Sequence, residues 1–260
     1  MSGFRLVGVL HLPPLPGAAN YSGASVREMA EAAAADATVL EAAGFSDVMV
    51  QDASDNPQPT TVGAATVAAL AVVGAAVRAA TDMGLGVIAG HNDGAASVAV
   101  AHAVGAQFVR VKVLTGVSAG PTGFIEGCSV DVAQMKRLLG SNVEVWADAH
   151  EATSAALLGD TAWAAAQALA FGGADKLIVT RDSGVEDALE DIARVKSEVG
   201  EGIDVLVGGR VTGDTLPAVM RGADGVILGS VLKTSGGHAA RIDPVKAQHL
   251  GSQHSASLLR

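Results

Sequence analysis

The sequence is poor in cysteine and in aromatic residues. Cys128 is the only cysteine among 260 residues, and phenylalanine, tryptophan and tyrosine together make up 3% of the chain. A single cysteine excludes an internal disulfide framework and is typical of a reducing compartment, so we expect a cytoplasmic protein with an inert thiol. With so few rings, the core must be built from Ala, Val, Leu and Ile, which suits a parallel sheet covered by helices on both faces.

Basic runs and membrane-like segments are also scarce. The formal net charge is −10 and no run of Lys and Arg occurs, which argues against a nucleic-acid partner because phosphate backbones need clustered positive charge. The N-terminus lacks the apolar segment of a secretion signal. Residues 60–77 carry no charge, but they are mostly Ala, Gly, Thr and Val, and we interpret them as a buried helix and expect no membrane insertion.

What the sequence does contain is a regular alternation of short β-branched runs with Ala-rich amphipathic runs, which indicates parallel βα units. Strands are predicted at residues 5–10, 47–51, 86–90, 108–113, 143–147, 176–180, 204–207 and 225–228. Helices are predicted at 25–43 and 154–170, among others, and a long loop is predicted up to residue 127. The pattern predicts a single (β/α)8 TIM barrel over residues 1–250 and a flexible C-terminal tail at 251–260.

An open, doubly wound sheet is the alternative fold for such a pattern. That fold usually carries a glycine-rich dinucleotide-binding turn after the first strand. Here the turn after the first strand is HLPPLPG (residues 11–17), and its prolines have no N–H group to offer a phosphate. The closed barrel is therefore the favoured prediction.

Charged residues alternate with apolar ones inside two predicted strands. Arg110 and Lys112 alternate with valines, and Glu144 and Asp148 share one parity of the next strand. Because helices cover the outside of a closed barrel, these side chains must point inward, where unpaired charges are costly. We therefore expect Arg110 and Glu144 to form a structural ion pair toward the closed end, and Lys112 to face Asp148 at the open end.

Polar residues gather at the predicted carboxyl ends of the strands, where barrel active sites form. The candidate catalytic residues are His11, Asp52, Asn92, Lys112, Asp148 and His150. Asp148 or Asp52 is the candidate general base or acid, His11 or His150 its partner, and Lys112 an electrostatic stabiliser. Lys112 could instead form a Schiff base if burial lowered its pKa, but an ion pair with Asp148 would keep it charged. A structural role for a strand-end histidine such as His11 remains the alternative.

A cofactor is not specified by these residues. His, Asp and Asn side chains at the strand ends are compatible with a divalent metal, although no tight ligand motif such as HExxH occurs. Asp93, which follows His91 and Asn92, is interpreted as a helix N-cap.

Two glycine-containing strand ends near the C-terminus indicate a phosphate site. Gly208, Gly209 and Arg210 follow the seventh predicted strand, and Gly229 and Ser230 follow the eighth. Glycines let backbone N–H groups approach a phosphate, and barrels often bind phosphate at this pair of loops. The alternative is two ordinary glycine turns.

Several strings of the sequence resemble the BtpA/SgcQ family. The opening GVLHLPPLPG (residues 8–17) is similar to the family's opening signature. Further similar strings follow in order: HND (91–93), FVRVKV (108–113), GFIEG (123–127), WADAH (146–150), VLVGGRVT (205–212) and ADGVILGSVLK (223–233). The resemblance covers nearly the whole chain, and its opening string is the most specific.

The resemblance implies a ribulose-phosphate-binding type of barrel, in a family whose members are linked to photosystem I accumulation or to sugar uptake, with many loosely labelled phosphoribosylanthranilate isomerase-like. This sequence departs from the common pattern at the site: it has Gln51-Asp52 for Glu-Asn, Lys112 for Asn, and His150-Glu151-Ala152 for a more basic run. These changes leave its substrate open.

Two function classes follow from these residues. The first is an enzyme, an isomerase, a lyase or one acting on a glycosyl bond, whose substrate is a phosphorylated sugar or nucleotide-like small molecule. The alternative is a non-catalytic assembly or stability factor, which needs a partner-binding patch that this acidic, aromatic-poor sequence does not display. A homo-oligomer is compatible with either class.

Overall fold

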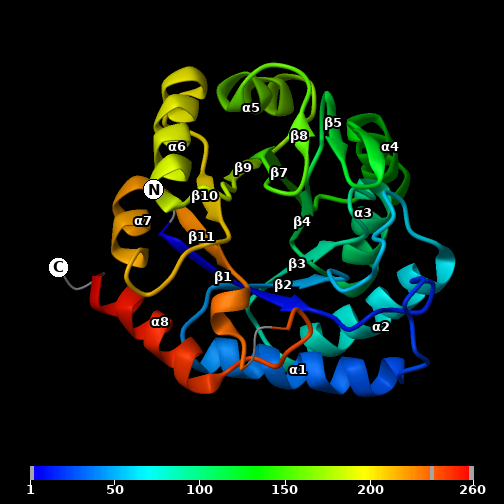
Figure 1. The fold of residues 1–260 in the computed structure, drawn as a ribbon. Coiled ribbons are helices and arrows are strands. Elements are labelled where there is room, and N and C mark those ends of the chain that lie inside the picture. The colour runs from blue at the N-terminus through cyan, green and yellow to red at the C-terminus, as the bar shows by residue number, and fades with distance from the viewer. Residues whose placement is uncertain (1–2, 235–236, 258–260) are drawn as a thin grey trace.

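The computed structural model describes residues 3–234 and 237–257 and contains a closed barrel of eight parallel strands (Figure 1). Around the barrel the strands are β1 (Arg5–His11), β11 (Gly225–Leu228), β10 (Val205–Gly208), β9 (Lys176–Val179), β7 (Glu144–His150), β4 (Phe108–Val111), β3 (Gly84–Ile88) and β2 (Asp47–Gln51). Because every pairing is parallel, the carboxyl ends of all eight strands meet at one end, which we call the mouth. The predicted (β/α)8 barrel is confirmed.

Helices surround the strands and begin where the sequence supplies caps. They are α1 (Val26–Ala42), α2 (Ala64–Ala80), α3 (Gly94–Val104), α4 (Ser129–Leu139), α5 (Thr161–Ala170), α6 (Val185–Val199), α7 (Leu216–Gly222) and α8 (Pro244–Ser257). The side chains of Ser25, Asp93 and Asp160 accept hydrogen bonds from the first turns of α1, α3 and α5, so the predicted N-cap at Asp93 is confirmed. None of the helices in the described ranges is long and apolar enough to cross a membrane.

Apolar side chains form two separate cores. The larger one lies between the strands and the helices and is built mainly of Val, Leu and Ala. The smaller one fills the inside of the barrel, where Phe108 and Trp146 stack with ring centroids 3.7 Å apart. Gly86 makes room for this stack, because a Cβ there would lie 2.1 Å from the Phe108 ring. We call this inner cluster the apolar layer; its other members are Val7, Val9, Met49, Ile88, Ile178, Leu206 and Ile227.

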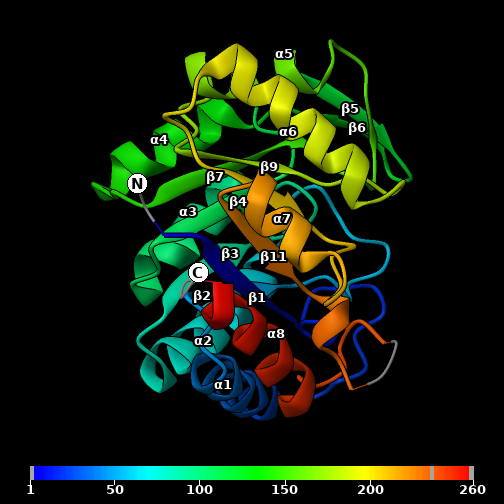
Figure 2. The ribbon, with the colours of Figure 1, turned by 90° about the vertical axis from the view of Figure 1, so that its left-hand side faces the viewer.

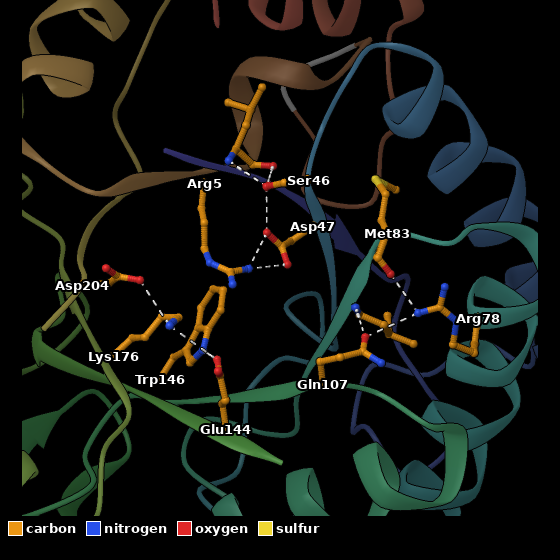
Figure 3. A network of polar contacts seen from close by, with 12 residues as sticks. Arg5, Ser46, Asp47, Arg78, Met83, Gln107, Glu144, Trp146, Lys176 and Asp204 are labelled. Atoms are coloured by element: carbon orange, nitrogen blue, oxygen red, sulfur yellow. Dashed lines mark hydrogen bonds and ion pairs between the residues drawn. The ribbon is translucent and has the colours of Figure 1, made fainter. Parts of the chain in front are cut away.

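A polar network lies below the apolar layer, at the closed end (Figure 3). Arg5 donates to both carboxyl oxygens of Asp47 and lies over the Trp146 ring. Glu144 accepts from the Trp146 indole N–H at 2.8 Å and pairs with Lys176. Glu144 is therefore held at the closed end by Trp146 and Lys176, and the predicted ion pair between Arg110 and Glu144 is wrong.

The strands predicted at 86–90, 108–113 and 143–147 are present with shifted ends, at 84–88, 108–111 and 144–150, and three other segments differ more. Residues 114–127, predicted as a loop, contain the hairpin β5 (Val117–Gly120) and β6 (Gly123–Glu126), which joins β8 (Ala155–Ala156) in a small sheet beside α5 (Figure 2). The helix predicted from 154 begins only at Thr161, because Asp160 caps it. Residues 251–257, predicted as a flexible tail, are the last part of α8, and residues 258–260 lie outside the described residues.

Candidate active site

A cavity opens at the mouth, where His11 ends β1 and Gln51 ends β2. It has a volume of about 540 Å³ and is lined by these two residues, by Arg110 of β4, and by the loops 209–212 and 229–231 that follow β10 and β11. The structure thus brings the predicted catalytic His11 and both predicted phosphate loops to one cavity. Gln51 reaches it because the β2 residues Asp47, Met49 and Gln51 share the inward face, a parity that the sequence already displays.

Arg110 and Asp148 form a buried bidentate ion pair inside the barrel. Arg110 Nε donates to Oδ1 at 2.9 Å and Nη2 donates to Oδ2 at 2.7 Å, and the Asp148 side chain is fully buried. Burial raises the pKa of the Asp148 carboxyl, while the charge and hydrogen bonds of Arg110 act in the opposite direction. Since Arg110 binds both carboxyl oxygens, Asp148 orients that guanidinium toward the cavity.

Lys112 lacks the partner that the sequence predicted, because Arg110 has taken the carboxylate of Asp148. No hydrogen bond or ion pair joins the Lys112 amine to any side chain in residues 3–234 and 237–257. The side chain lies two residues beyond Arg110 and borders a second cavity of about 730 Å³, together with His91 and His238. Burial lowers the pKa of Lys112, and the charge of Arg110 adds to this effect. The Lys112 side chain is thus half-buried at the edge of this cavity.

Glu151 and His91 stand near this amine and were not among the predicted catalytic residues. Burial acts to raise the pKa of Glu151, but hydrogen bonds from Ser154 and Thr153 outweigh it and lower the pKa, so the carboxylate is ionised. His91 Nε2 lies 3.9 Å from Glu151 Oε1, and burial lowers the pKa of His91. Glu151 directly follows β7 and His91 lies in the loop after β3, and this position at the carboxyl ends of strands is the signal that could have identified them.

His11 and His150 differ in their hydrogen bonding. Burial, with Lys233 next, lowers the pKa of His11 to about 3, so its ring is neutral at physiological pH. Its Nδ1 is buried without a hydrogen-bond partner among the described residues, and its ring centroid lies 5.4 Å from that of His238. His150 Nδ1 lies 2.6 Å from the Thr180 carbonyl oxygen; a neutral ring donates there, which leaves the Nε2 lone pair as a base.

The side chains of Asp52 and Asn92, also predicted as catalytic, form hydrogen bonds with backbone groups. Asp52 is fully buried and accepts from the Gly90 amide at 2.7 Å, and burial raises its pKa to about 6. Asn92 accepts from the Val113 amide and donates to the carbonyls of Val113 and Glu126. Asn92 therefore ties the end of β3 to the segment that follows β4.

The two predicted phosphate loops lie at the mouth as expected, but their backbone amides differ in whether they already have a hydrogen-bond acceptor. The Gly209 amide donates to Ile227, and Arg210, in a left-handed conformation with φ 58°, extends to Asp182 on the surface. The backbone amides of Gly229 and Ser230, by contrast, have no acceptor in the part of the chain that the structure describes. Gly208 cannot carry a side chain without displacing Thr180, since a Cβ there would lie 2.1 Å from Thr180 Oγ1.

The site has no obvious place for a metal. In the described ranges, no group of three or more His, Cys, Asp or Glu side chains could hold a metal ion. Cys128 lies outside the mouth, beside α3 and α4, and burial raises the pKa of its thiol to about 11. Besides the Arg110–Asp148 pair, the charged side chains near the mouth include Lys112 and Glu151.

Comparison with known proteins identifies the family. The model of the BtpA family matches residues 4–255. The chain belongs to the BtpA family. An uncharacterized protein of Thermococcus kodakarensis is 38% identical over 231 residues, which are 89% of this chain and 87% of the relative. The photosystem I biogenesis protein BtpA of Synechocystis is 32% identical over 245 residues, which are 93% of this chain and 84% of the relative.

Solved structures similar to this BtpA-family chain include two enzymes with phosphorylated compounds in their names. KGPDC of Streptococcus mutans in complex with D-R5P has a TM-score of 0.59 and 14% identity, covering 97% of this chain and 98% of its own. Phosphoribosyl anthranilate isomerase of Thermus thermophilus has a TM-score of 0.54 and 11% identity, covering 98% and 100%. At such low identity the likeness shows the fold alone, and it agrees with the predicted (β/α)8 barrel.

Proposed function

We propose that this BtpA-family protein is an enzyme that acts on a phosphorylated sugar, or a related small phosphate compound, bound in the mouth of the barrel. The observation that carries the proposal is the cavity of about 540 Å³ with the unpaired amides of Gly229 and Ser230 on one side and the Arg110 guanidinium on another. Amides at a strand-to-helix turn and a fixed guanidinium are the groups that bind phosphate oxygens.

Hydrogen-bond donors at the mouth suit an anion. Asp148 balances the charge of Arg110 but binds only its Nε and Nη2, so the N–H groups of Nη1 have no partner among the described residues and can donate to a phosphate oxygen. The neutral His11 ring borders the same cavity and has an unpaired Nδ1 that can donate or accept one hydrogen bond. KGPDC, a barrel of the same fold, is named in complex with D-R5P, which agrees with a phosphosugar ligand here.

For acid–base chemistry the candidates are Glu151 and His150. Glu151 is an ionised carboxylate, and His150 has a free Nε2, so either can accept a proton from a bound substrate. Lys112 can stabilise negative charge that develops on an oxygen of the substrate. This set suits an isomerase or lyase that moves a proton next to a carbonyl group.

The alternative role, an assembly or stability factor, needs a surface for a partner. Phe124 is 73% exposed on β6, and Leu157 and Leu158 are half-exposed beside β8, so the small sheet carries more apolar surface than the composition suggests. No feature of the described residues identifies what would cover it. The mouth carries the more specific chemistry, and we therefore favour the enzyme.

Phosphate binding tests the proposal directly. Inorganic phosphate and sugar phosphates are titrated into the labelled protein while the amide NMR signals of Gly229 and Ser230 are followed. We expect saturable shifts at these two amides, and weak or no shifts with the same sugars lacking phosphate. Shifts confined to residues outside the mouth would overturn the proposal.

A pair of glycine variants supplies the control. In Gly229→Ala the new Cβ would lie 2.9 Å from His11 Cε1 and must displace that ring, so we expect at least about tenfold weaker phosphate binding, equivalent to ~1.4 kcal/mol. In Gly202→Ala the new Cβ meets no described atom within 4 Å, and binding should be unchanged. Equal affinities for the two variants would contradict the assignment.

A further inference from the structure

Lys112 differs from the other lysines of the chain in its surroundings. Lys176 and Lys196 are engaged in ion pairs with carboxylates. Lys233 and Lys246 donate to backbone carbonyls, and Lys136 lies on the surface helix α4. Lys112 alone among these six borders the two cavities that also contain His91 and His150.

We propose that Lys112 is a carbonyl-reactive amine that forms a Schiff base with the open-chain aldehyde or ketone of a phosphorylated sugar. The proposal rests on the proposed function, because the phosphate would be held in the mouth cavity described above. It extends that function by naming the reactive form of the substrate and the nucleophile that meets it.

The Arg110–Asp148 pair is what leaves the amine free. A carboxylate in a direct ion pair with Lys112 would hold its proton, and an ammonium has no lone pair for attack. In the structure both oxygens of Asp148 bind Arg110, at 2.9 and 2.7 Å, so neither forms an ion pair with Lys112. Burial and the positive charge of Arg110 lower the pKa of Lys112. They outweigh the charges of Glu151, Asp148 and Asp52, which act to raise it, so the balance shifts toward the neutral amine, as in other lysines activated beside a second cation.

The barrel order places this amine across the mouth from the phosphate loops. β4, which precedes Lys112, is the fourth strand from β11 in the closed ring, so the two lie on opposite sides. Arg110 lines the phosphate cavity, and Lys112 is the next residue of the same parity along the chain. A chain with phosphate at one end and a carbonyl group at the other can therefore meet both sides of the mouth.

Schiff-base formation is a condensation of the Lys112 amine with the carbonyl group and needs no cofactor. The amine lone pair attacks the carbonyl carbon, a C–N bond forms, and the C=O π electrons move to the oxygen. The nitrogen gives up two protons and the oxygen takes up two, so the C–O bond breaks with loss of water and a C=N bond remains. Glu151, whose charge acts on Lys112, is the candidate proton acceptor, and His91, 3.9 Å from Glu151, is placed to relay the proton.

Reductive trapping tests this inference on the intact protein. Wild type is incubated with glyceraldehyde 3-phosphate or with glyceraldehyde, reduced with borohydride, and mapped by peptide mass spectrometry. With the phosphorylated probe, we expect labelling of Lys112 to exceed that of the surface residue Lys136 by at least about tenfold, because binding raises the effective concentration at the site. Excess inorganic phosphate should suppress the label at Lys112 and leave Lys136 unchanged.

Variants and binding separate the two proposals. The main adduct in intact mass should disappear in Lys112→Arg and persist in Lys136→Arg; the ratio within wild type decides the question even if Lys112→Arg folds poorly. Phosphate-dependent shifts at Gly229 and Ser230 without a label at Lys112 would overturn the Schiff base and leave the proposed function standing. A label at Lys112 that is equal for both probes, with no amide shifts, would overturn the phosphosugar substrate itself.

Discussion

Replacing Asp148 by Asn should destabilise the protein strongly, because it removes one partner of a buried ion pair. The introduced side-chain amide would be neutral, and its NH₂ group would face the guanidinium N–H groups of Arg110, donor against donor. Breaking a buried pair in this way costs about 3–5 kcal/mol. For a chain of this size, each kcal/mol corresponds to roughly 2–4 °C in Tm, so a fall of about 6–20 °C is expected in a thermal melt.

Two further variants make the measurement decisive. Glu190→Gln removes an exposed pair with Arg194 at 3.4 Å and should cost less than about 0.5 kcal/mol. The double variant Arg110→Met/Asp148→Leu removes both buried charges and should recover most of the stability lost in Asp148→Asn. The reasoning is refuted if Asp148→Asn costs less than ~1 kcal/mol, or if the double variant is less stable than the single one.

Three other outcomes follow from groups near the mouth. The pKa of His11 is about 3 in the folded state against an ordinary 6.5. The free energy of unfolding should therefore be highest above pH 6.5 and fall as the pH drops toward 3, because only the unfolded state takes up the proton in that range. The loss is about 2 kcal/mol by pH 5. His11→Phe should flatten that slope in urea unfolding at pH 5 and 7; an unchanged slope would exclude His11 as its source. Asn92→Leu leaves polar groups of Val113 and Glu126 unpaired and should cost ~2–4 kcal/mol in chemical denaturation, whereas a loss below ~1 kcal/mol would show that water replaces the amide. Cys128, with a pKa of about 11 against 9.0, should react with a disulfide reagent on the order of 100-fold more slowly when folded than in urea, and equal rates would contradict its burial.

The direction of the charged side chains was predictable, and their partners were not. Strand parity correctly places Arg110 and Asp148 inside the barrel, because helices cover the outer face of every strand. Parity does not give the height of one strand relative to the next. In the actual register Arg110 is opposite Trp146, so its guanidinium reaches Asp148, and Glu144 is left to Lys176 at the closed end.

The small sheet at the mouth was missed for a different reason. Residues 114–127 contain glycines that favoured a loop, yet Gly120 to Gly123 form the turn of a hairpin, with Gly123 at φ 107°. Its apolar positions are few, and Ile125 is the buried one, so the strand pattern is weak. The pKa shifts at His11 and Glu151 were likewise beyond the sequence, since they depend on burial and on partners distant in the chain.

The stacked rings of Phe108 and Trp146 have a consequence for how this protein can change over evolutionary time. The two rings lie between the ion pairs of the closed end and those of the mouth, and none of the ion pairs among the described barrel residues joins the two sides. Substitutions on one side should therefore add independently to those on the other. A new charge at the mouth therefore need not disturb the polar network at the closed end. Relatives can exchange residues such as Gln51 or Lys112, and with them their chemistry, while keeping one barrel.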